Sequence, residues 1–231
     1  GRVNLDLMYA LPGQDAAGAL ADVAEALSYG SEHLSAYHLT IEPNTLFHRH
    51  PPALPDDDAS SDIEEAVEAE LARAGFEHYE TSAYARPGAR ARHNVNYWRF
   101  GDYLGVGAGA HSKLSYPDRV VREVRFKQPK AYQAGAMAGA AIQATHDVPA
   151  ADLPFEFAMN ALRLADGFTL ALFTERTGLP SAVLEALLAR AESQGLVERD
   201  AFSVRPTPRR RRFLNDLLGL FVPEAQPPQK G

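Results

Sequence analysis

The chain has 231 residues, of which 45% are hydrophobic and 23% are charged, with a formal net charge of −7 and no cysteine. This composition is typical of a globular protein with its own core, and it excludes a disulfide framework, a thiolate zinc site and a cysteine-held iron–sulfur cluster within these residues. The acidic charge argues against a surface that binds nucleic acid throughout, and because no apolar run reaches the roughly 18 residues that span a bilayer, we expect a cytoplasmic protein.

The first 85 residues alternate between strand and helix patterns. Strands are predicted at 3–9, 33–39 and 76–82, and helices at 16–27 and 61–71. The second helix begins with Ser61-x-x-Glu64, the pattern of a capping box, and Ile63, Val67 and Leu71 mark its buried side. This alternation predicts a parallel sheet, either doubly wound or part of a (β/α) barrel. Because the first strand starts almost at residue 1, we expect a piece of a longer protein.

Ligands of both sheet types bind at the carboxyl ends of the strands. The polar residues expected there are Asp6 with the 9–14 loop, Thr40 with Glu42 and Asn44, and Glu80 with Ser82. Asp6 is predicted at the end of a buried strand, where an ionised carboxylate needs a partner. A ligand hydroxyl or amine fits that role, and so does a neighbouring Arg or Lys.

A glycine-rich segment between residues 93 and 113 is expected to join these loops around one site. It contains the only tryptophan, two histidines and four glycines at short spacing. Glycine permits both close approach to a ligand and a tight turn, so a ligand loop and a structural turn are both compatible with the pattern. The order of residues lacks the phosphate-binding signatures G-x-x-x-x-G-K-[ST] and G-x-G-x-x-G.

The histidines of this segment have two interpretations each. His93 precedes the aromatic pair 97–98, a setting that suits an axial ligand or a proton carrier beside a flat molecule, or else a hydrogen-bonded structural histidine. His111 either caps a ligand or bonds a neighbouring carbonyl. His33 and His38 lie in a predicted strand and are interpreted as structural.

The remainder of the chain changes to a mainly helical pattern. A strand at 120–126 and an alanine-rich helix at 128–143 precede helices within 155–164, 170–178, 180–194 and 213–221, with a hairpin at 196–204. This order is winged-helix-like. The arginine run 209–212 suggests nucleic acid as a competing interpretation, but the helix before the hairpin carries Glu185 and Glu192 against one arginine, which favours a solvated face.

Six ordered segments carry a family resemblance along nearly the whole chain: VNLDLMYALPGQ, HLSAYHLTIEPNT, YETSAYARPG, RHNVNYWRFGDYLGVGAGAHSKL, FEFAMNALRL and RRFLNDLLGLF. They resemble the HemW-like heme chaperone group of radical S-adenosylmethionine proteins, which is related to oxygen-independent coproporphyrinogen III oxidases. The resemblance implies a partial (β/α) barrel with a [4Fe–4S] cluster and S-adenosylmethionine, a helical C-terminal domain, heme as a bound ligand and heme-accepting proteins as partners.

The resemblance also implies roles for four residues. Asp6 matches a residue that contacts S-adenosylmethionine, Thr40 and His111 match positions lining that nucleotide or a second ligand, and His93 matches a histidine implicated in heme binding. The family's Cys-x-x-x-Cys-x-x-Cys motif precedes the first strand and is absent here. We therefore assign no catalytic residue and no metal ligand, since without thiolates a cluster and its anchorage of S-adenosylmethionine are lost.

These observations predict the second part of a radical S-adenosylmethionine partial (β/α) barrel over residues 1–145, a winged-helix-like domain over 146–222 and a flexible tail over 223–231. The predicted function is heme binding and transfer, with the chain alone catalytically inactive. The alternatives are coproporphyrinogen III oxidase activity in porphyrin biosynthesis and a nucleic-acid-binding winged-helix module.

Overall fold

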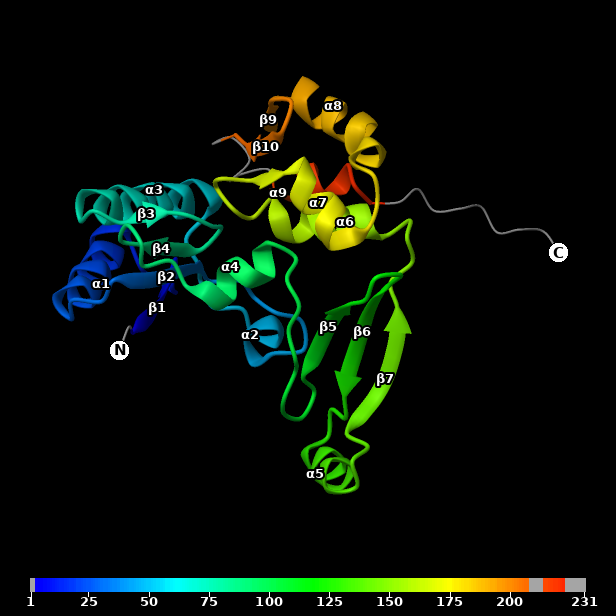
Figure 1. Cartoon of the computed structure of the whole chain (residues 1–231). Coiled ribbons are helices and arrows are strands. Elements are labelled where there is room, and N and C mark those ends of the chain that lie inside the picture. Colours follow the sequence, from blue (N-terminus) through cyan, green and yellow to red (C-terminus); the bar gives the residue numbers. More distant parts are fainter. Residues whose placement is uncertain (1–2, 208–213, 223–231) are drawn as a thin grey trace. The chain divides into compact units, whose positions relative to one another are not determined.

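The computed structural model describes residues 3–207 and 214–222, and the chain divides into two compact units after Arg92 (Figure 1). The fold is mixed α/β, as predicted. The arginine run 209–212 and the predicted tail 223–231 lie outside the described residues. Within the described ranges, no helix combines the length and the apolar composition that crossing a membrane requires.

The first unit is a four-stranded sheet with helices on one face (Figure 1). Its elements are β1 (Asn4–Tyr9), α1 (Ala16–Ser28), β2 (His33–His38), α2 (Leu46–Arg49), α3 (Asp57–Arg73), β3 (Glu77–His78) and β4 (Ala83–Ala85). The strand order is β1-β2-β4-β3, with β1 and β2 parallel and β4 antiparallel to both of its neighbours. The predicted parallel pairing is therefore confirmed for β1 and β2 only.

The long helix α3 starts earlier than the capping-box pattern predicts. Its N-cap is Asp56, whose carboxylate accepts a hydrogen bond from the Ala59 amide at 2.8 Å, and two further aspartates occupy the first turn. Acidic groups are favourable there because they satisfy free amides and complement the helix dipole. The predicted start at Ser61 is wrong, since Ser61 lies one turn inside the helix.

The core of the first unit lies between the sheet and these helices. Ile63, Val67 and Leu71 are buried in it, as their spacing predicts. The register of β1 turns Leu5 and Leu7 towards the same core. At about 25 cal/mol per Å² of apolar surface, this burial is what fixes which face of β1 meets the helices.

The third predicted strand is shorter than expected. Of residues 76–82, only Glu77–His78 forms β3, and the chain then turns back into β4, which inserts between β2 and β3. The pattern of 76–82 does not show this turn, because Tyr79 and Glu80 are buried like strand residues although they lie outside the strand.

The second unit begins with α4 (Arg92–Trp98) and an antiparallel sheet of β5 (His111–Ser115), β6 (Val120–Arg125) and β7 (Ile142–Asp147). Helix α5 (Pro129–Met137) lies at the end of this sheet, between β6 and β7 (Figure 1). The alanine-rich helix predicted at 128–143 therefore ends early: the chain turns at Gly139, where φ is +70°, and continues as β7. The domain boundary predicted after residue 145 falls within β7 and stays a prediction.

The rest of the second unit follows the winged-helix-like order. Its elements are α6 (Leu153–Ala161), β8 (Phe168–Thr169), α7 (Leu170–Thr177), a 3-10 turn (Ser181–Leu184), α8 (Glu185–Ser193), β9 (Val197–Arg199), β10 (Ser203–Pro206) and α9 (Leu214–Gly219). β8, β10 and β9 form a small antiparallel sheet, and β9 with β10 is the predicted hairpin. Helix α7 ends at Gly178, which is in the left-handed conformation.

An aromatic cluster holds this core together. Phe157 is fully buried, and its ring makes edge-on contacts with Phe168 at 5.0 Å and Phe173 at 5.2 Å between centroids. Phe100, just after α4, contacts the same ring at 5.8 Å. The loop that follows α4 is thus anchored in the core of the helical part.

Candidate functional site

The sheet of the first unit has one face covered by helices and one polar face. Side chains alternate along a strand, so the residues beside the inward leucines point the other way. The polar face comprises Asn4, Asp6 and Met8 of β1 and their neighbours in register on β2, His33, Ser35 and Tyr37. A ligand that binds to this sheet meets polar groups on this face.

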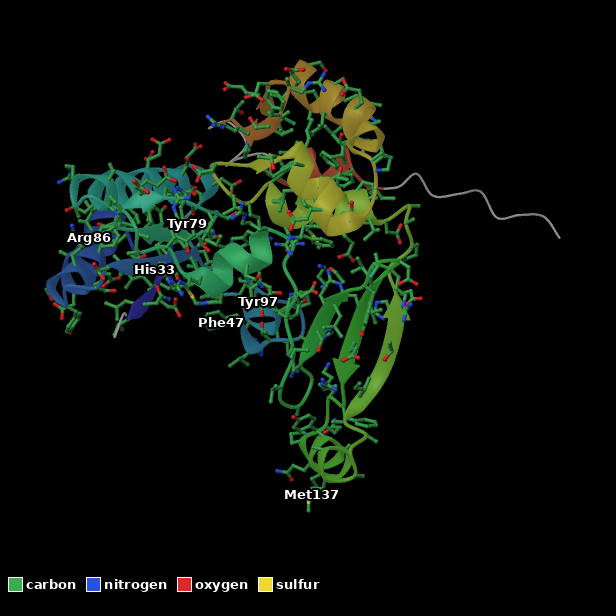
Figure 2. The ribbon with its side chains drawn as sticks, viewed as in Figure 1. His33, Phe47, Tyr79, Arg86, Tyr97 and Met137 are labelled. Carbon is green, nitrogen blue, oxygen red and sulfur yellow. The ribbon has the colours of Figure 1, made fainter. Side chains whose placement is uncertain are left out.

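A neutral hydrogen-bond network lies on the polar face, where β1 and β2 begin (Figure 2). The Nδ1 atom of buried His33 lies 2.6 Å from Oδ1 of Asn4, and its Nε2 atom lies 2.8 Å from the hydroxyl of Tyr79. In the neutral ring, Nδ1 donates to the amide oxygen and Nε2 accepts from the hydroxyl. Both ring nitrogens are satisfied, which agrees with the interpretation of His33 as structural.

Asp6 lies in the middle of β1, not at its end. Its side chain is exposed, it pairs in register with Ser35, and its carboxylate accepts a hydrogen bond from Nδ2 of Asn4 at 2.7 Å. The expected position at the end of a buried strand is therefore wrong. The alternation that turns Leu5 and Leu7 to the helices places Asp6 on the polar face, where its free oxygens are accessible.

Three of the four predicted ligand loops meet at one edge of the first unit's sheet. β1 and β2 run parallel, and the amide of Leu39 donates to the carbonyl of Tyr9 at 3.0 Å, so the loops after both strands start side by side. β3 runs in the same direction, because β4 is antiparallel to both β2 and β3. The turn with buried Glu80 thus lies at the same edge.

Thr40 is exposed in the loop after β2, where its hydroxyl donates to Glu42 at 3.4 Å. It lies several residues beyond Ser35, the neighbour of Asp6, so the structure does not place Thr40 directly beside Asp6. The two candidate contacts occupy different levels of the sheet, and only an extended ligand can contact both.

Two glycines of the second unit's loop serve the chain's own packing. A Cβ atom at Gly105 would lie 2.2 Å from the carbonyl oxygen of His111, and one at Gly101 would lie 2.1 Å from the side chain of Asn96. Both positions therefore require glycine. At these two residues the structure supports the structural turn over a ligand approach.

A buried lysine fastens this turn. Lys113 is only 1% exposed, and its ammonium group donates to the carbonyl of Phe100 at 2.8 Å, to Asp102 at 3.0 Å and to the hydroxyl of Ser115 at 2.9 Å. All three of its protons are used. The group also lies 4.0 Å above the ring of Phe100, which has a left-handed backbone conformation with φ of +54°.

Burial and hydrogen bonding shift both charged groups of this cluster. Burial lowers the pKa of Lys113, and although Asp102 opposes that shift, the nearby charges of Arg122 and Arg176 add to it. Burial acts to raise the pKa of Asp102, but hydrogen bonds from Ser115 and Lys113 outweigh it and leave the pKa lowered. Burial thus disfavours the charged form of Lys113, whereas the hydrogen bonds from Ser115 and Lys113 favour the charged form of Asp102.

His93 and Tyr97 lie on one side of α4. They are four residues apart, a spacing that places side chains on the same helix face. Both are exposed, and Tyr97, which is labelled in Figure 2, is exposed to 38%. The ring of Tyr97 contacts that of Tyr103 edge-on at 4.6 Å, and the hydroxyl of Tyr103 accepts a hydrogen bond from Arg122 at 2.8 Å. α4 thus presents an imidazole and a fixed aromatic ring together.

The end of α4 is held by the fastened turn. The amide of Gly101 donates to the carbonyl of Asn96 at 2.8 Å, and the side chain of Asn96 donates to the carbonyl of Asp102 at 2.9 Å. Trp98 packs under the guanidinium of Arg163, 4.9 Å from the ring centroid. Its buried Nε1 atom has no hydrogen-bond partner among the described residues.

His111 is the first residue of β5, and its side chain is exposed. We expected His111 inside the glycine-rich loop, but the loop ends at residue 110 and His111 begins β5. His93 and His111 belong to the second unit, whereas Asp6 and Thr40 belong to the first. Across residues 3–207 and 214–222, no group of three or more His, Asp or Glu side chains is arranged to hold a metal ion.

Two features escaped the sequence reasoning. The alternation of Asn4 and Asp6 with leucines, and of His33 and Ser35 with apolar residues, signals a polar sheet face and could have identified the network. The role of Lys113 had no such signal, because its burial depends on Phe100 and Asp102, which reach it through a turn.

The chain is similar in sequence to known proteins along most of its length. The HemN C-terminal domain matches residues 148–213. The chain is 46% identical over 222 residues to a protein of Escherichia coli named "Heme chaperone HemW", covering 96% of this chain and 58% of that protein. The corresponding protein of Haemophilus influenzae is 44% identical, with 96% and 57% covered. The chain thus spans little more than half the length of these relatives.

The fold has a solved counterpart. The structure titled "Coproporphyrinogen III oxidase (HemN) from Escherichia coli is a Radical SAM enzyme" superposes with a TM-score of 0.73 at 20% identity, over 94% of this chain and 54% of that one. The likeness supports the predicted fold class and is consistent with the C-terminal portion of such a protein. By its sequence matches, and in agreement with its fold, the chain is similar over nearly its whole length to part of the proteins named heme chaperone HemW, the part that includes the HemN C-terminal domain.

Proposed function

We propose that this chain binds heme through His93 and forms part of a HemW-like protein that transfers heme to acceptor proteins in the cytoplasm. The observation that carries the proposal is the exposed pair of His93 and Tyr97 on one face of α4. Relatives named heme chaperones support it by sequence, at 46% and 44% identity.

The chemistry of this pair suits heme. An exposed neutral imidazole is a common axial ligand of heme iron, and an aromatic ring one helical turn away offers an apolar surface to the edge of the macrocycle. Tyr97 is held by Tyr103, so little side-chain entropy is lost when a ligand packs against it.

The site also fits the task of handing heme on. His93 lies on the surface of α4 rather than in a closed pocket of the described residues, so one face of a bound heme would stay accessible. A single axial ligand with limited burial holds heme less tightly than a closed pocket does. Exchange with an acceptor is therefore favoured.

The cofactors of the family fit this chain unequally. The 231 residues contain no cysteine and so supply no thiolate for an iron–sulfur cluster. We propose Asp6 as a contact of S-adenosylmethionine, and Thr40 of the same unit as a contact of that molecule or of a second ligand. His111 of the second unit keeps the same two alternatives. The exposed carboxylate of Asp6 suits the cationic amine or a ribose hydroxyl of S-adenosylmethionine.

The two alternative functions have less support. The coproporphyrinogen III oxidase with the similar fold is 20% identical to this chain, whereas the Escherichia coli heme chaperone is 46% identical to it. Heme transfer is therefore favoured over oxidase activity. For the chain alone we expect no radical chemistry, because the cluster that cleaves S-adenosylmethionine has no ligands here. Nucleic-acid binding has no support from the comparisons reported above.

A heme titration of the full 231-residue chain tests the proposal. We expect a shifted Soret band with the wild type and at least about a tenfold weaker interaction with His93→Ala, since an axial bond is worth more than about 1.4 kcal/mol. His146→Ala is the matched control, because His146 is also an exposed histidine of the second unit, on β7.

The outcomes separate clearly. Loss of binding with His93→Ala and its retention with His146→Ala support the assignment. Equal binding by both variants removes His93 from the role, and absence of a Soret shift with the wild type contradicts heme binding by this chain. A Tyr97→Phe variant should bind as the wild type does if the ring acts through its apolar surface.

A further inference from the structure

A groove in the helical part of the second unit has an apolar floor and an acidic rim. It has a volume of about 440 Å³ and lies between the start of α7, helix α8 and the β9–β10 hairpin. We call it the acidic groove, and its lining residues are Leu170, Leu188, Ala201, Val204, Glu185, Glu192, Asp200 and Arg199. It is distant in sequence from α4 and is not used by the proposed heme contact.

The residue that follows Ala201 of the groove lining is an exposed aromatic residue at the hairpin tip. Leu188 and Val204 are buried at the base of the groove, and Phe202 at the hairpin tip is 77% exposed. The amide of Leu170 donates to the carbonyl of Phe202 at 2.9 Å, which keeps the tip against the groove. A large aromatic group that is exposed beside a preformed apolar hollow is typical of a protein-binding hot spot.

The rim of the acidic groove has an excess of negative charge. Arg199 donates to Glu185 at 2.8 Å and to Glu192 at 2.7 Å, so one guanidinium is shared by two carboxylates. Asp200 adds a third carboxylate, whose oxygens accept the amides of Phe202 and Ser203. With three carboxylates and one guanidinium, the lining has a net charge of −2.

A second guanidinium of the hairpin offsets part of this charge. Hydrogen bonds from Phe202 and Ser203 lower the pKa of Asp200, and the charge of Arg205 on β10 adds to that shift. Among the described residues, the three carboxylates of the rim still outnumber the guanidiniums of Arg199 and Arg205. The position between α8 and the hairpin is the one that would face nucleic acid in a winged-helix domain, and here its carboxylates repel phosphate.

We propose that the acidic groove docks a lysine- or arginine-rich segment of a partner protein that carries an apolar anchor. The anchor would fill the hollow above Leu188 and Val204 and pack on Phe202, while the cations of the segment pair with Glu185, Glu192 and Asp200. This interaction goes beyond heme binding, since it involves none of the residues assigned to the heme contact.

Fluorescence anisotropy with a labelled synthetic peptide tests the docking site on the full chain. The probe has a central phenylalanine flanked by lysines. The matched probes replace the lysines by glutamates or the phenylalanine by alanine. We expect the basic peptide to bind, and Glu185→Gln with Glu192→Gln to weaken it at least about fivefold, because charged rim contacts near an apolar anchor are worth about 1 kcal/mol.

Two further variants locate the site. Phe202→Ser, a change of a side chain that is already exposed, should weaken binding at least about threefold, whereas Glu198→Gln, on the other side of the hairpin, should leave it unchanged. Failure of the basic peptide to bind, equal binding of the acidic peptide, or an equal loss with Glu198→Gln overturns the proposal. Binding of duplex DNA that competes with the peptide also overturns it. The heme titration is independent of all these results.

Discussion

The two units each contain a buried polar cluster, and the clusters differ in kind. The first unit has the neutral network of Asn4, His33 and Tyr79 on a sheet face, whereas the second has the ionic cluster of Lys113 and Asp102 below a turn. Both satisfy their hydrogen bonds. They differ in what they hold: the first joins side chains of β1, β2 and the turn after β3, and the second fixes a backbone carbonyl.

The candidate heme contact depends on the ionic cluster and not on the network of the first unit. Lys113 binds the carbonyl of Phe100, and Phe100 follows the helix that carries His93. The neutral network lies in the other unit and orders the face that carries Asp6. We therefore expect changes to the ionic cluster to affect α4, and changes to the network to affect the polar face.

The largest effect is expected from Lys113→Met. The change keeps an unbranched side chain of similar shape but removes all three donors, so the buried carbonyl of Phe100 loses its hydrogen bond from Lys113 and the cation–π contact disappears. We expect the free energy of unfolding to fall by about 2–3 kcal/mol. Urea unfolding followed by Trp98, the only tryptophan, measures it in the same unit.

Lys130→Met is the control for this change, because Lys130 is exposed on α5 and should cost less than about 0.5 kcal/mol. If Lys113→Met is equally mild, burial of the ammonium group offsets its contacts, and the cluster does not hold the turn.

A smaller effect is expected from Tyr79→Phe. Removal of the hydroxyl takes away its 2.8 Å hydrogen bond with Nε2 of His33 in a buried position, which should lower the free energy of unfolding by about 1–2 kcal/mol. Far-ultraviolet circular dichroism during urea unfolding detects the loss. Tyr29→Phe removes a similar bond to Glu25 at an exposed site and should change little. Equal effects would mean that the network adds nothing beyond a surface bond.

The smallest effect is the pH dependence of Asp102. Its pKa is lowered in the folded state, so its contribution is present above the unfolded value of about 3.9 and is lost as the pH falls through the folded value. Because its side chain is 42% exposed, the contribution should be below about 1 kcal/mol. Asp102→Asn should flatten the acid side of the stability profile. If the free energy of unfolding depends on pH equally in both proteins between about pH 5 and about pH 3, the role assigned to Asp102 is contradicted.

Much of the fold could be predicted from periodicity. The helix α1, the strands β1 and β2 and the β9–β10 hairpin lie where their patterns indicate, because each buries one side against a core and is bounded by turn residues. The strands β5 and β7 were missed. Their sequences, HSKLS and IQATHD, carry little apolar alternation, since β7 is exposed along its length and β5 buries a lysine instead of an aliphatic residue.

The candidate site was predictable in part. The motif around His93 identified the heme contact that we propose, and the helical spacing of His93 and Tyr97 could be read once a helix was assigned. The position of Asp6 in the middle of β1 could not be predicted from the sequence, because pairing with β2 sets both where β1 ends and which of its residues face the helices.

The sequence by itself determined the residue types, their order and the alternation that separates a helix-covered face from a polar one, because these follow from local geometry. The tertiary structure alone decided why the glycines at 101 and 105 are needed, which lysine is buried, and where an acidic groove opens between α8 and the hairpin. Each of these depends on atoms that are separated in the sequence and brought within contact distance only when the chain packs.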